Sequence, residues 1–165
     1  MVPPMWDMTI NDLSVRPVAP QDADFLRTLF MAVQRPSFAA VPLSDAQLTQ
    51  MLDMQYSAQT QSHAAVHPDA VDHLLLKGKM SVGRLSAKRT AAGIHLIDFA
   101  IVPDHQAKGI GTSVLKAVCD HAHQQGHDIT LQVFKGNSAQ RLYQRLGFKP
   151  FADADPYLKM ILPAP

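Results

Sequence analysis

Residues 99–118 read FAIVPDHQAKGIGTSVLKAV and join a strand pattern to a helix pattern through two glycines. The apolar run Phe99–Val102 ends at a Pro-Asp pair, and apolar residues return at helical spacing from Ile110. A helix start leaves its first amides without intrahelical acceptors, and Gly109 and Gly111 carry no Cβ that would keep a phosphate oxygen away. The stretch therefore predicts an α/β protein whose glycine loop binds an anion.

Two common nucleotide-binding motifs do not fit this loop. GIGTSV lacks the third glycine of the dinucleotide fingerprint, and GxxxxGK followed by Ser or Thr occurs nowhere in the chain. Three predicted strands in a row also precede the loop, whereas a nicotinamide-binding domain alternates strands with helices. The order of elements therefore disfavours the alternative of a nicotinamide or nucleotide enzyme.

The composition describes a folded chain without a strongly charged face. It has 165 residues, 47% of them hydrophobic, and a formal net charge of +1. We expect a single domain over residues 13–165, preceded by a loose extension over residues 1–12. The balanced charge argues against nucleic acid or a membrane as a partner. The single cysteine, Cys119, cannot form an internal disulfide, which fits a cytoplasmic protein.

The rest of the chain predicts a mixed α/β sheet interrupted by helices. Helices are expected after Asp22, from Ser44, from Ile110 to about Gly126, and between Asn137 and Gly147. Ser44 is followed three residues later by Gln47, which is the pattern of a capping box. Strands are expected over residues 13–18, on both sides of a turn at 77–79, over 95–102 and 128–134, and twice after residue 148.

A second motif, LQVFKGNSAQRLYQRLGF at residues 131–148, follows the glycine helix. Together with FAIVPDHQAKGIG at residues 99–111, it resembles the two core motifs of the GNAT superfamily of acyl-CoA-dependent N-acetyltransferases. The first motif has Gln106, Gly109 and Gly111 in the places of the family's Q/R-x-x-G-x-G/A loop. The second matches in part, because its small residue, Ala139, stands closer to Asn137 than in the family. The resemblance implies the GNAT acyl-CoA N-acyltransferase fold, an α/β fold with six to seven strands and about four helices.

The resemblance also implies a binding site for coenzyme A. In the family, backbone amides of the glycine loop hold the diphosphate, and the central strand binds the pantetheine arm through its backbone. Many relatives carry glycine where this chain has Ala107, and Lys108 would add positive charge near the phosphates. The implied binding residues are Ala100, Ile101, Val102, Gln106, Ala107, Lys108, Gly109, Ile110, Gly111, Thr112, Asn137 and Tyr143.

The expected reaction needs a proton acceptor. An alkyl amine has a pKa of about 10.4, so only about one molecule in a thousand is the free nucleophile at neutral pH. His95 stands at the strand position where some family members place a Glu or His base, and an imidazole suits proton transfer near pH 7. Asp98 is the second candidate, because a carboxylate within LIDFAIV needs a partner or a role. Strict alternation puts the two on opposite faces, but a β-bulge would change this, so the choice stays open.

Two residues of the second motif have implied roles. Tyr143 matches the family's general acid, and a phenol with a pKa of about 10 stays protonated at neutral pH and can donate to a leaving thiolate. Asn137 matches a residue that commonly contacts the cofactor, and it also stands where a helix cap would.

Other reactive side chains predict no further site. His63 and His67 are four residues apart, but no carboxylate or cysteine accompanies them at metal-ligand spacing, so no metal is expected. Cys119 lies in an apolar helical stripe and is interpreted as a core residue.

The resemblance thus implies an enzyme that moves an acetyl or small acyl group from coenzyme A directly to a primary amine of a small molecule or peptide. Acetyl-CoA would be the co-substrate. In the family, the first two helices and their connection, here including residues 34–43, border the acceptor site. The alternative is a non-catalytic acyl-CoA-binding sensor. The residues do not identify the acceptor, and the resemblance leaves a homodimer open.

Overall fold

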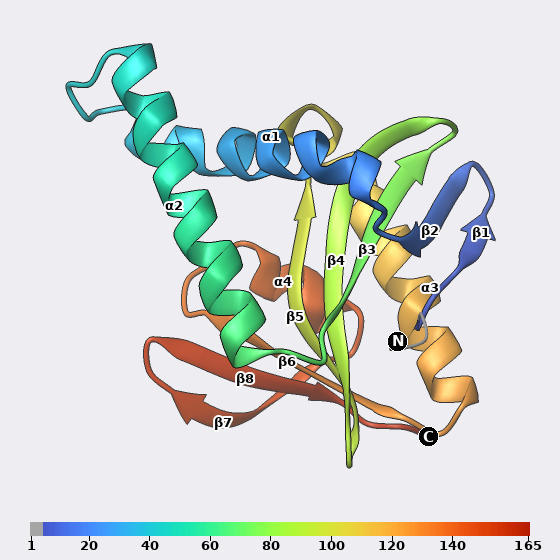
Figure 1. Ribbon diagram of the computed structural model, residues 1–165. Helices are drawn as coiled ribbons and strands as arrows, with labels where there is room; N and C mark the ends of the chain where they lie inside the picture. The colour runs from blue at the N-terminus through green and yellow to red at the C-terminus, as the bar shows by residue number, and fades with distance from the viewer. Residues whose placement is uncertain (1–4) are drawn as a thin grey trace.

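The computed structural model describes residues 5–165 as one sheet with helices on both faces (Figure 1). The strands are β1 (Met8–Ile10), β2 (Leu13–Pro17), β3 (Val71–Lys77), β4 (Met80–Thr90), β5 (Gly93–Ile101), β6 (Asp128–Phe134), β7 (Lys149–Ala154) and β8 (Tyr157–Leu162). They lie in the order β1, β2, β3, β4, β5, β6, β8, β7. Only β5 and β6 are paired in parallel among the described strands, because a helix connects them.

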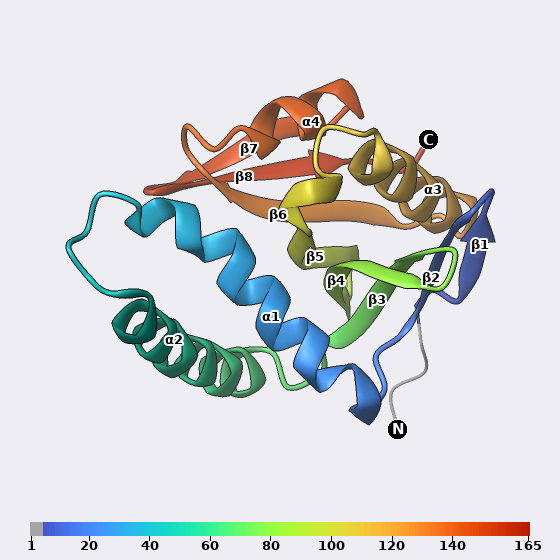
Figure 2. The same ribbon diagram turned by 90° about the horizontal axis from the view of Figure 1, so that it is seen from above.

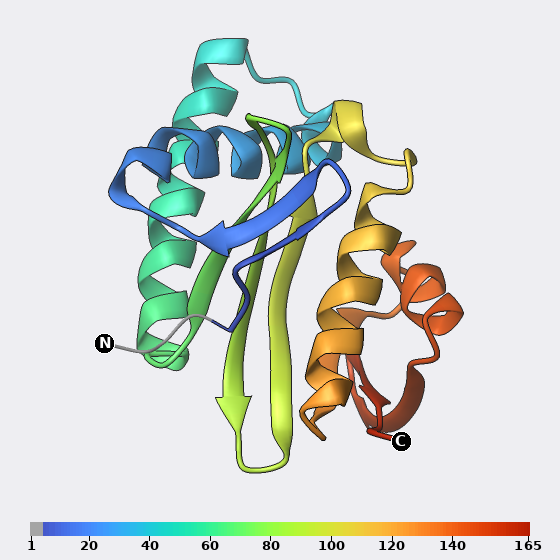
Figure 3. The ribbon, with the colours of Figure 1, turned by 90° about the vertical axis from the view of Figure 1, so that its right-hand side faces the viewer.

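The four α-helices are α1 (Ala23–Gln34), α2 (Asp45–Val66), α3 (Ile110–Gln124) and α4 (Ala139–Arg145). Single 3₁₀ turns lie at Pro20–Asp22, Arg35–Phe38 and Pro103–His105. Figures 2 and 3 show α1 and α2 over one face of the sheet and α3 and α4 over the opposite face. The mixed α/β sheet with about four helices is therefore confirmed.

The larger core lies between the sheet and α3. Val114, Leu115 and Val118 of α3 are buried there against strand residues that include Leu85 and Ile129. Helix α2 is held differently, because its buried residues Leu48 and Leu52 pack with Met31 of α1. The far half of α2 stands over the sheet without contributing to either core, and this leaves room for a cavity beneath it.

The start of α2 forms as the sequence predicts. The Ser44 hydroxyl accepts a hydrogen bond from the Gln47 N–H at 3.2 Å, and the Gln47 side chain accepts one from the Ser44 N–H at 2.9 Å. The capping box is therefore confirmed, and it satisfies two donors at the exposed end of a helix that borders the cavity.

The expectation of six to seven strands was too low by one, and the missed strand is β1. It lies within residues 1–12, which we expected to be loose. Met5 and Trp6 are instead buried at 6% and 2% exposure, and β1 pairs with β2. Residues 1–4 lie outside the described part of the chain. One Trp and a short apolar pattern are not enough to predict a strand. Burial of the large Trp6 indole nevertheless strongly favours attachment of this segment to the core.

Strand β5 contains a bulge that determines which side chains reach the cavity. Across from it on β4, Lys88 pairs with His95 and Ala87 with Leu96, but Ser86 pairs with Asp98, so Ile97 is the extra residue. Lys88 and Ser86 are two apart and share one face of β4, and their partners His95 and Asp98 consequently share that face too.

Candidate active site

The glycine loop ends in a left-handed turn that starts α3. Gly109 is the N-cap of α3 with φ of 78°, a conformation that costs an L-residue about 1–2 kcal/mol. The first helical bond runs from the Ser113 N–H to the Gly109 carbonyl at 3.0 Å. The amides of Ile110, Gly111 and Thr112 precede that bond, so they stand outside the intrahelical ladder and are available to an anion. A Cβ on Gly109 would meet no atom within 4 Å, because the loop opens outward there.

The two other small residues of the loop are small for different reasons. A Cβ on Gly111 would lie 3.4 Å from the Phe99 ring, so this glycine lets α3 pack closely on β5. Ala107 has a φ of 62°, in the left-handed region that glycine adopts most readily. The glycine that the resemblance implies for many relatives at this position therefore has a conformational explanation.

The remaining loop side chains divide into anchors and exposed groups. Gln106 is exposed but anchored, because its Nε2 donates to the Ile101 carbonyl at 3.0 Å and ties the loop to the end of β5. Ile110 is buried in the core and presents only its backbone. Lys108 is exposed, and Thr112 is half-buried.

The edge of β5 that faces β6 is open beyond the bulge. The parallel pairing joins Gly93–Leu96 to Asp128–Leu131 and goes no further in the described structure. From Ile97 onward the two strands diverge (Figure 1), while β4 still pairs with β5 through Ile101 and the Val102 N–H donates to Val82 at 2.8 Å. The backbone of Ala100, Ile101 and Val102 thus forms one side of a wedge that leads to the glycine loop.

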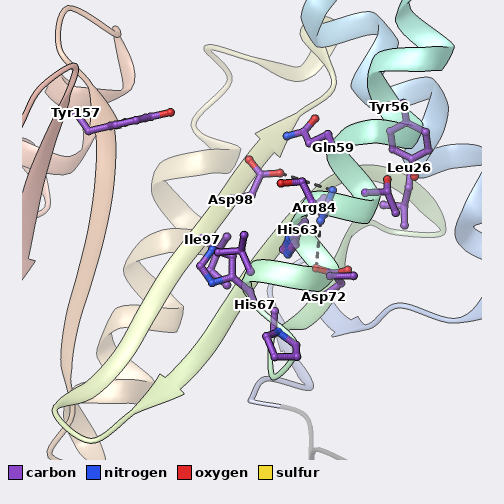
Figure 4. A pocket seen from close by; sticks show the side chains of 16 residues that line it. Leu26, Tyr56, Gln59, His63, His67, Asp72, Arg84, Ile97, Asp98 and Tyr157 are labelled. Carbon is purple, nitrogen blue, oxygen red and sulfur yellow. Dashed lines mark hydrogen bonds and ion pairs between the residues drawn. The ribbon is translucent and has the colours of Figure 1, made fainter.

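A cavity of about 650 Å³ lies between α2 and the face of the sheet that carries Asp98. Figure 4 shows Arg84 between two carboxylates at its wall. Arg84 Nη2 donates to Asp72 Oδ1 at 3.2 Å, and Arg84 Nη1 lies 3.7 Å from Asp98 Oδ2. Two carboxylates and one guanidinium leave this trio with one net negative charge, which favours a cationic ligand.

Several cavity residues were not predicted as site residues, because they lie on distant elements. Nε2 of His63 on α2 lies 3.2 Å from the hydroxyl of Ser86, the residue opposite Asp98 on β4. Tyr157 reaches the cavity from the start of β8 and points toward β5 and Asp98 (Figure 4). The sequence offered two signals of this wall: the spacing of His63 and His67 on one helix face, and the resemblance, which implies that the second helix borders the acceptor site.

His95 and Asp98 share a face but line different cavities. His95 is half-buried, its Nδ1 lies 2.9 Å from the Thr130 hydroxyl, and it borders a smaller cavity next to Lys88. Burial lowers the pKa of His95, and the positive charge of Lys88 lowers it further. His95 therefore stands where β5 and β6 are still paired, whereas Asp98 stands where they open.

Tyr143 lies on α4 and packs against the core beside Phe148, with ring centroids 5.8 Å apart. Burial raises the pKa of Tyr143 to about 12, and the negative charge of Asp98 contributes to this increase. The phenol is therefore protonated at neutral pH and lies within electrostatic reach of Asp98.

Asn137 and Cys119 have structural surroundings. Asn137 is exposed, and its Oδ1 accepts a hydrogen bond from the Ala139 N–H at 2.8 Å at the start of α4. Cys119 is buried in the core, and burial raises the pKa of its thiol to about 12. A thiol that stays protonated is a poor nucleophile, so Cys119 packs as a small apolar residue.

Residues 5–165 contain no group of three or more His, Cys, Asp or Glu side chains arranged to hold a metal ion. None of the helices in this range is both long and apolar enough to cross a membrane.

The comparison with family models identifies this arrangement. Residues 41–157, most of the chain, match the model described as an acetyltransferase (GNAT) domain. The chain belongs to the GNAT acetyltransferase family. The matched range of this GNAT domain includes the cavity wall on α2, the glycine loop and Tyr143. The comparison with curated protein sequences gives no match.

Solved structures share the fold of this GNAT domain. The PaiA N-acetyltransferase of Thermoplasma acidophilum in complex with coenzyme A superposes with a TM-score of 0.68 at 18% identity, over 92% of this chain and 98% of that one. An acetyltransferase from Thermus thermophilus gives 0.66 at 26% identity, over 94% and 99%. The ribosomal-protein-S5-alanine acetyltransferase of Vibrio fischeri gives 0.66 at 17% identity, over 96% and 97%.

Proposed function

We propose that this protein transfers an acetyl group from acetyl-CoA to a primary amine bound in the cavity between α2 and the sheet. One observation carries the proposal: the open edge of β5 connects the free amides at the start of α3 with the carboxylate of Asp98. A donor that is held by its diphosphate at the glycine loop and extended along β5 would bring its thioester to that carboxylate. Because the reaction consumes acetyl-CoA, we also propose the cytoplasm as its location.

The residues fit coenzyme A at both of its recognisable parts. The amides of residues 110–112 and the open turn at Gly109 suit a diphosphate, and exposed Lys108 adds a positive charge nearby. Backbone groups of Ala100, Ile101 and Val102 would pair with the amides of the pantetheine arm as a neighbouring strand does. The PaiA enzyme of the same fold was solved with coenzyme A, which supports this assignment.

The Asp98 side receives the amine. A primary amine arrives as a cation, and the net negative charge of Asp72, Arg84 and Asp98 favours its binding at this wall. Arg84 contacts both carboxylates and thereby orients Asp98. The Vibrio fischeri protein of the same fold is named for acetylating an alanine of a ribosomal protein, which is consistent with an amine acceptor.

Asp98 then takes the proton of the attacking amine. An ammonium has no lone pair, so the bound amine first loses one proton to water in the cavity. Attack of the free amine on the thioester carbon then makes the nitrogen much more acidic, so Asp98, although a weak base, takes the remaining proton favourably. His63 lies next to Asp98 through Ser86 and would carry the proton onward to the cavity. We place this role on Asp98 rather than His95 because His95 borders the other cavity.

Tyr143 donates the second proton. When the carbon–sulfur bond breaks, the departing thiolate of coenzyme A needs a proton to become the free thiol. The Tyr143 phenol keeps its proton at neutral pH, because burial raises its pKa, and it lies within electrostatic reach of Asp98, where the thioester is expected. No covalent enzyme intermediate is required, and buried Cys119 is not used.

The test is release of free thiol from acetyl-CoA in the presence of a panel of primary amines. We expect at least one amine to accelerate release, with the acetylated amine detected by mass spectrometry. If no amine in a broad panel of amino acids, polyamines and peptides accelerates release, the catalytic proposal fails, and the non-catalytic binding module becomes the better description.

A further inference from the structure

A smaller cavity of about 370 Å³ adjoins the cavity that contains Asp98, and its charged side chains are cationic rather than anionic. Two lysines, Lys88 and Lys159, and two histidines, His67 and His95, contribute to its lining, and no carboxylate of the described residues does. Leu131 and the exposed ring of Phe151 supply its apolar portion. The cavity is therefore positively charged on a protein whose total charge is close to zero.

The polar side chains of this lining come from four neighbouring strands and from the end of one helix. Lys88 on β4 is opposite His95 on β5, and His95 is opposite Thr130 on β6. Lys159 on β8 is opposite Gln132, two residues further along β6 on the same face. His67, at the end of α2, covers this row from above and lies with its Nδ1 3.1 Å from the Lys88 ammonium. Lys88, His95, Thr130 and Lys159 thus form a row across the sheet, and strand pairing fixes the backbone position of each residue in it.

The lysines of this row have no carboxylate partner within residues 5–165. Neither Lys88 nor Lys159 takes part in an ion pair with another residue of the described chain, whereas Lys135 pairs with both Asp153 and Asp155. Burial is the largest cause that lowers the pKa of His95, the neighbouring Lys88, His67 and Lys159 lower it further, and no carboxylate opposes them. The one carboxylate that raises the pKa of His67 is Asp69, which is outside the lining. Clustered cations in a half-enclosed space repel one another, and a bound anion would offset that repulsion.

The positive cavity adjoins the cavity that contains Asp98. His67 lines both cavities. On β8, Tyr157 lines the cleft and Lys159, two residues later, lines the positive cavity. On β4, Ser86 lies opposite Asp98, and Lys88 lies opposite His95. Two residues along a strand span about 7 Å, so the backbone positions of the negative and positive sites lie about that far apart.

Resting on the proposed function, we propose that the acceptor is an amine that also carries a carboxylate or phosphate about 7 Å from its nitrogen, and that Lys88 and Lys159 bind this anion. The ammonium end pairs with the trio around Asp98 while the anion occupies the row of Lys88 and His95. An α-amino acid is too short to reach both sites. An extended ω-amino acid such as 6-aminohexanoate, or a peptide with an acidic second residue, has the required length, because an extended residue spans about 3.3–3.6 Å.

The first experiment compares acceptors of equal length on the wild-type protein. Thiol release is measured with 6-aminohexanoate, hexylamine and 1,6-diaminohexane, which end in an anion, a methyl group and a cation. We expect kcat/KM to be at least about tenfold higher for 6-aminohexanoate than for hexylamine and lowest for the diamine, since one charge-assisted hydrogen bond contributes that factor. Two further arms, 6-aminohexyl phosphate and peptides beginning Ala-Glu or Ala-Gln, distinguish phosphate from carboxylate and small molecules from peptides.

The second experiment removes the cations. In Lys88→Met/Lys159→Met, the ratio of kcat/KM for 6-aminohexanoate to that for hexylamine should fall at least about tenfold. Lys116→Met is the matched control, because Lys116 is exposed on α3 on the opposite side of the sheet and pairs only with Asp120 among the described residues. Calorimetry on the same proteins without acetyl-CoA measures binding of 6-aminohexanoate and of inorganic phosphate directly. We expect binding to the wild type and to Lys116→Met, and loss of binding in the double variant.

The outcomes separate the two proposals. If hexylamine is acetylated as well as 6-aminohexanoate, or if the double variant keeps the wild-type ratio, the anion site is overturned and amine acetylation stands. If no amine releases thiol but 6-aminohexanoate binds and the double variant loses that binding, the acetyltransfer proposal fails and the anion site stands. Absence of binding in calorimetry together with equal rates for all three amines overturns the anion site outright.

Discussion

The Arg84 guanidinium lies 3.7 Å from the Asp98 carboxylate, on the wall of the cleft and at the point where β5 and β6 separate. Arg84 also holds Asp72, so it orients Asp98 while leaving the group of three with one negative charge. This arrangement gives the cleft a defined site for a cationic amine beside the backbone edge on which the thioester is expected.

Replacement of Asp98 tests the proposed proton acceptor. Asp98→Asn keeps the size and polarity of the side chain but cannot accept the proton, so kcat should fall by about 10²–10⁴ while KM for acetyl-CoA changes little. His95→Gln is the comparison, and we expect it to reduce kcat less than about tenfold because His95 lies in the other cavity. A larger loss in His95→Gln than in Asp98→Asn would transfer the role to His95.

Replacement of Tyr143 tests the proposed proton donor. Tyr143→Phe keeps the ring that packs beside Phe148 and removes only the hydroxyl, so the melting temperature should change little. We expect kcat to fall by about 10²-fold, and the loss should shrink with an acyl donor whose leaving thiol is more acidic. Equal losses with good and poor leaving groups would show that Tyr143 acts only through packing.

Alanine at Gly109 tests the diphosphate site, and Gly126 provides a matched control. Both glycines have a φ of 78°, both have open space around the missing Cβ, and they lie at opposite ends of α3. Either replacement should lower the free energy of unfolding by about 1 kcal/mol, because alanine is strained in this conformation. Only Gly109→Ala should weaken coenzyme A binding in calorimetry. If Gly126→Ala weakens it equally, the effect comes from helix stability and the loop has no special role.

Acid should destabilise the protein before its carboxylates titrate. Burial is the main cause that lowers the pKa of His73, His95 and His67 in the folded state. His73 is held neutral, since its Nε2 accepts a hydrogen bond from the backbone N–H of Trp6 at 3.4 Å and its Nδ1 faces the Leu85 carbonyl at 3.3 Å. Below an unfolded pKa of about 6.5 the unfolded chain binds more protons than the folded one, so stability falls as the pH falls.

The measurement is the melting temperature at several pH values between about 7.5 and 5.5. It should decrease toward the acidic end, and the decrease should be smaller in His95→Gln, which lacks one of the three groups. A melting temperature that rises or stays constant over this range contradicts the lowered pKa values of these three histidines in the folded state.

Local signals in the sequence were sufficient for much of the fold. The capping box at Ser44 and Gln47, the apolar run of β5 and the glycine at the start of α3 each depend on neighbours in the chain, and each forms as predicted. Strand β1 was missed because its three residues carry little local pattern, and its attachment depends on burial of Trp6 in a distant core.

The sequence by itself determined the glycine loop, the order of strands and helices, and the family to which they belong, because these follow from short-range spacing and backbone preference. Only the tertiary structure decided which side chains meet. One extra residue at Ile97 turns Asp98 and His95 to the same face, and the far half of α2 brings His63 and His67 over them. Neither fact is encoded locally, since both depend on pairing with β4 and on how α2 stands above the sheet.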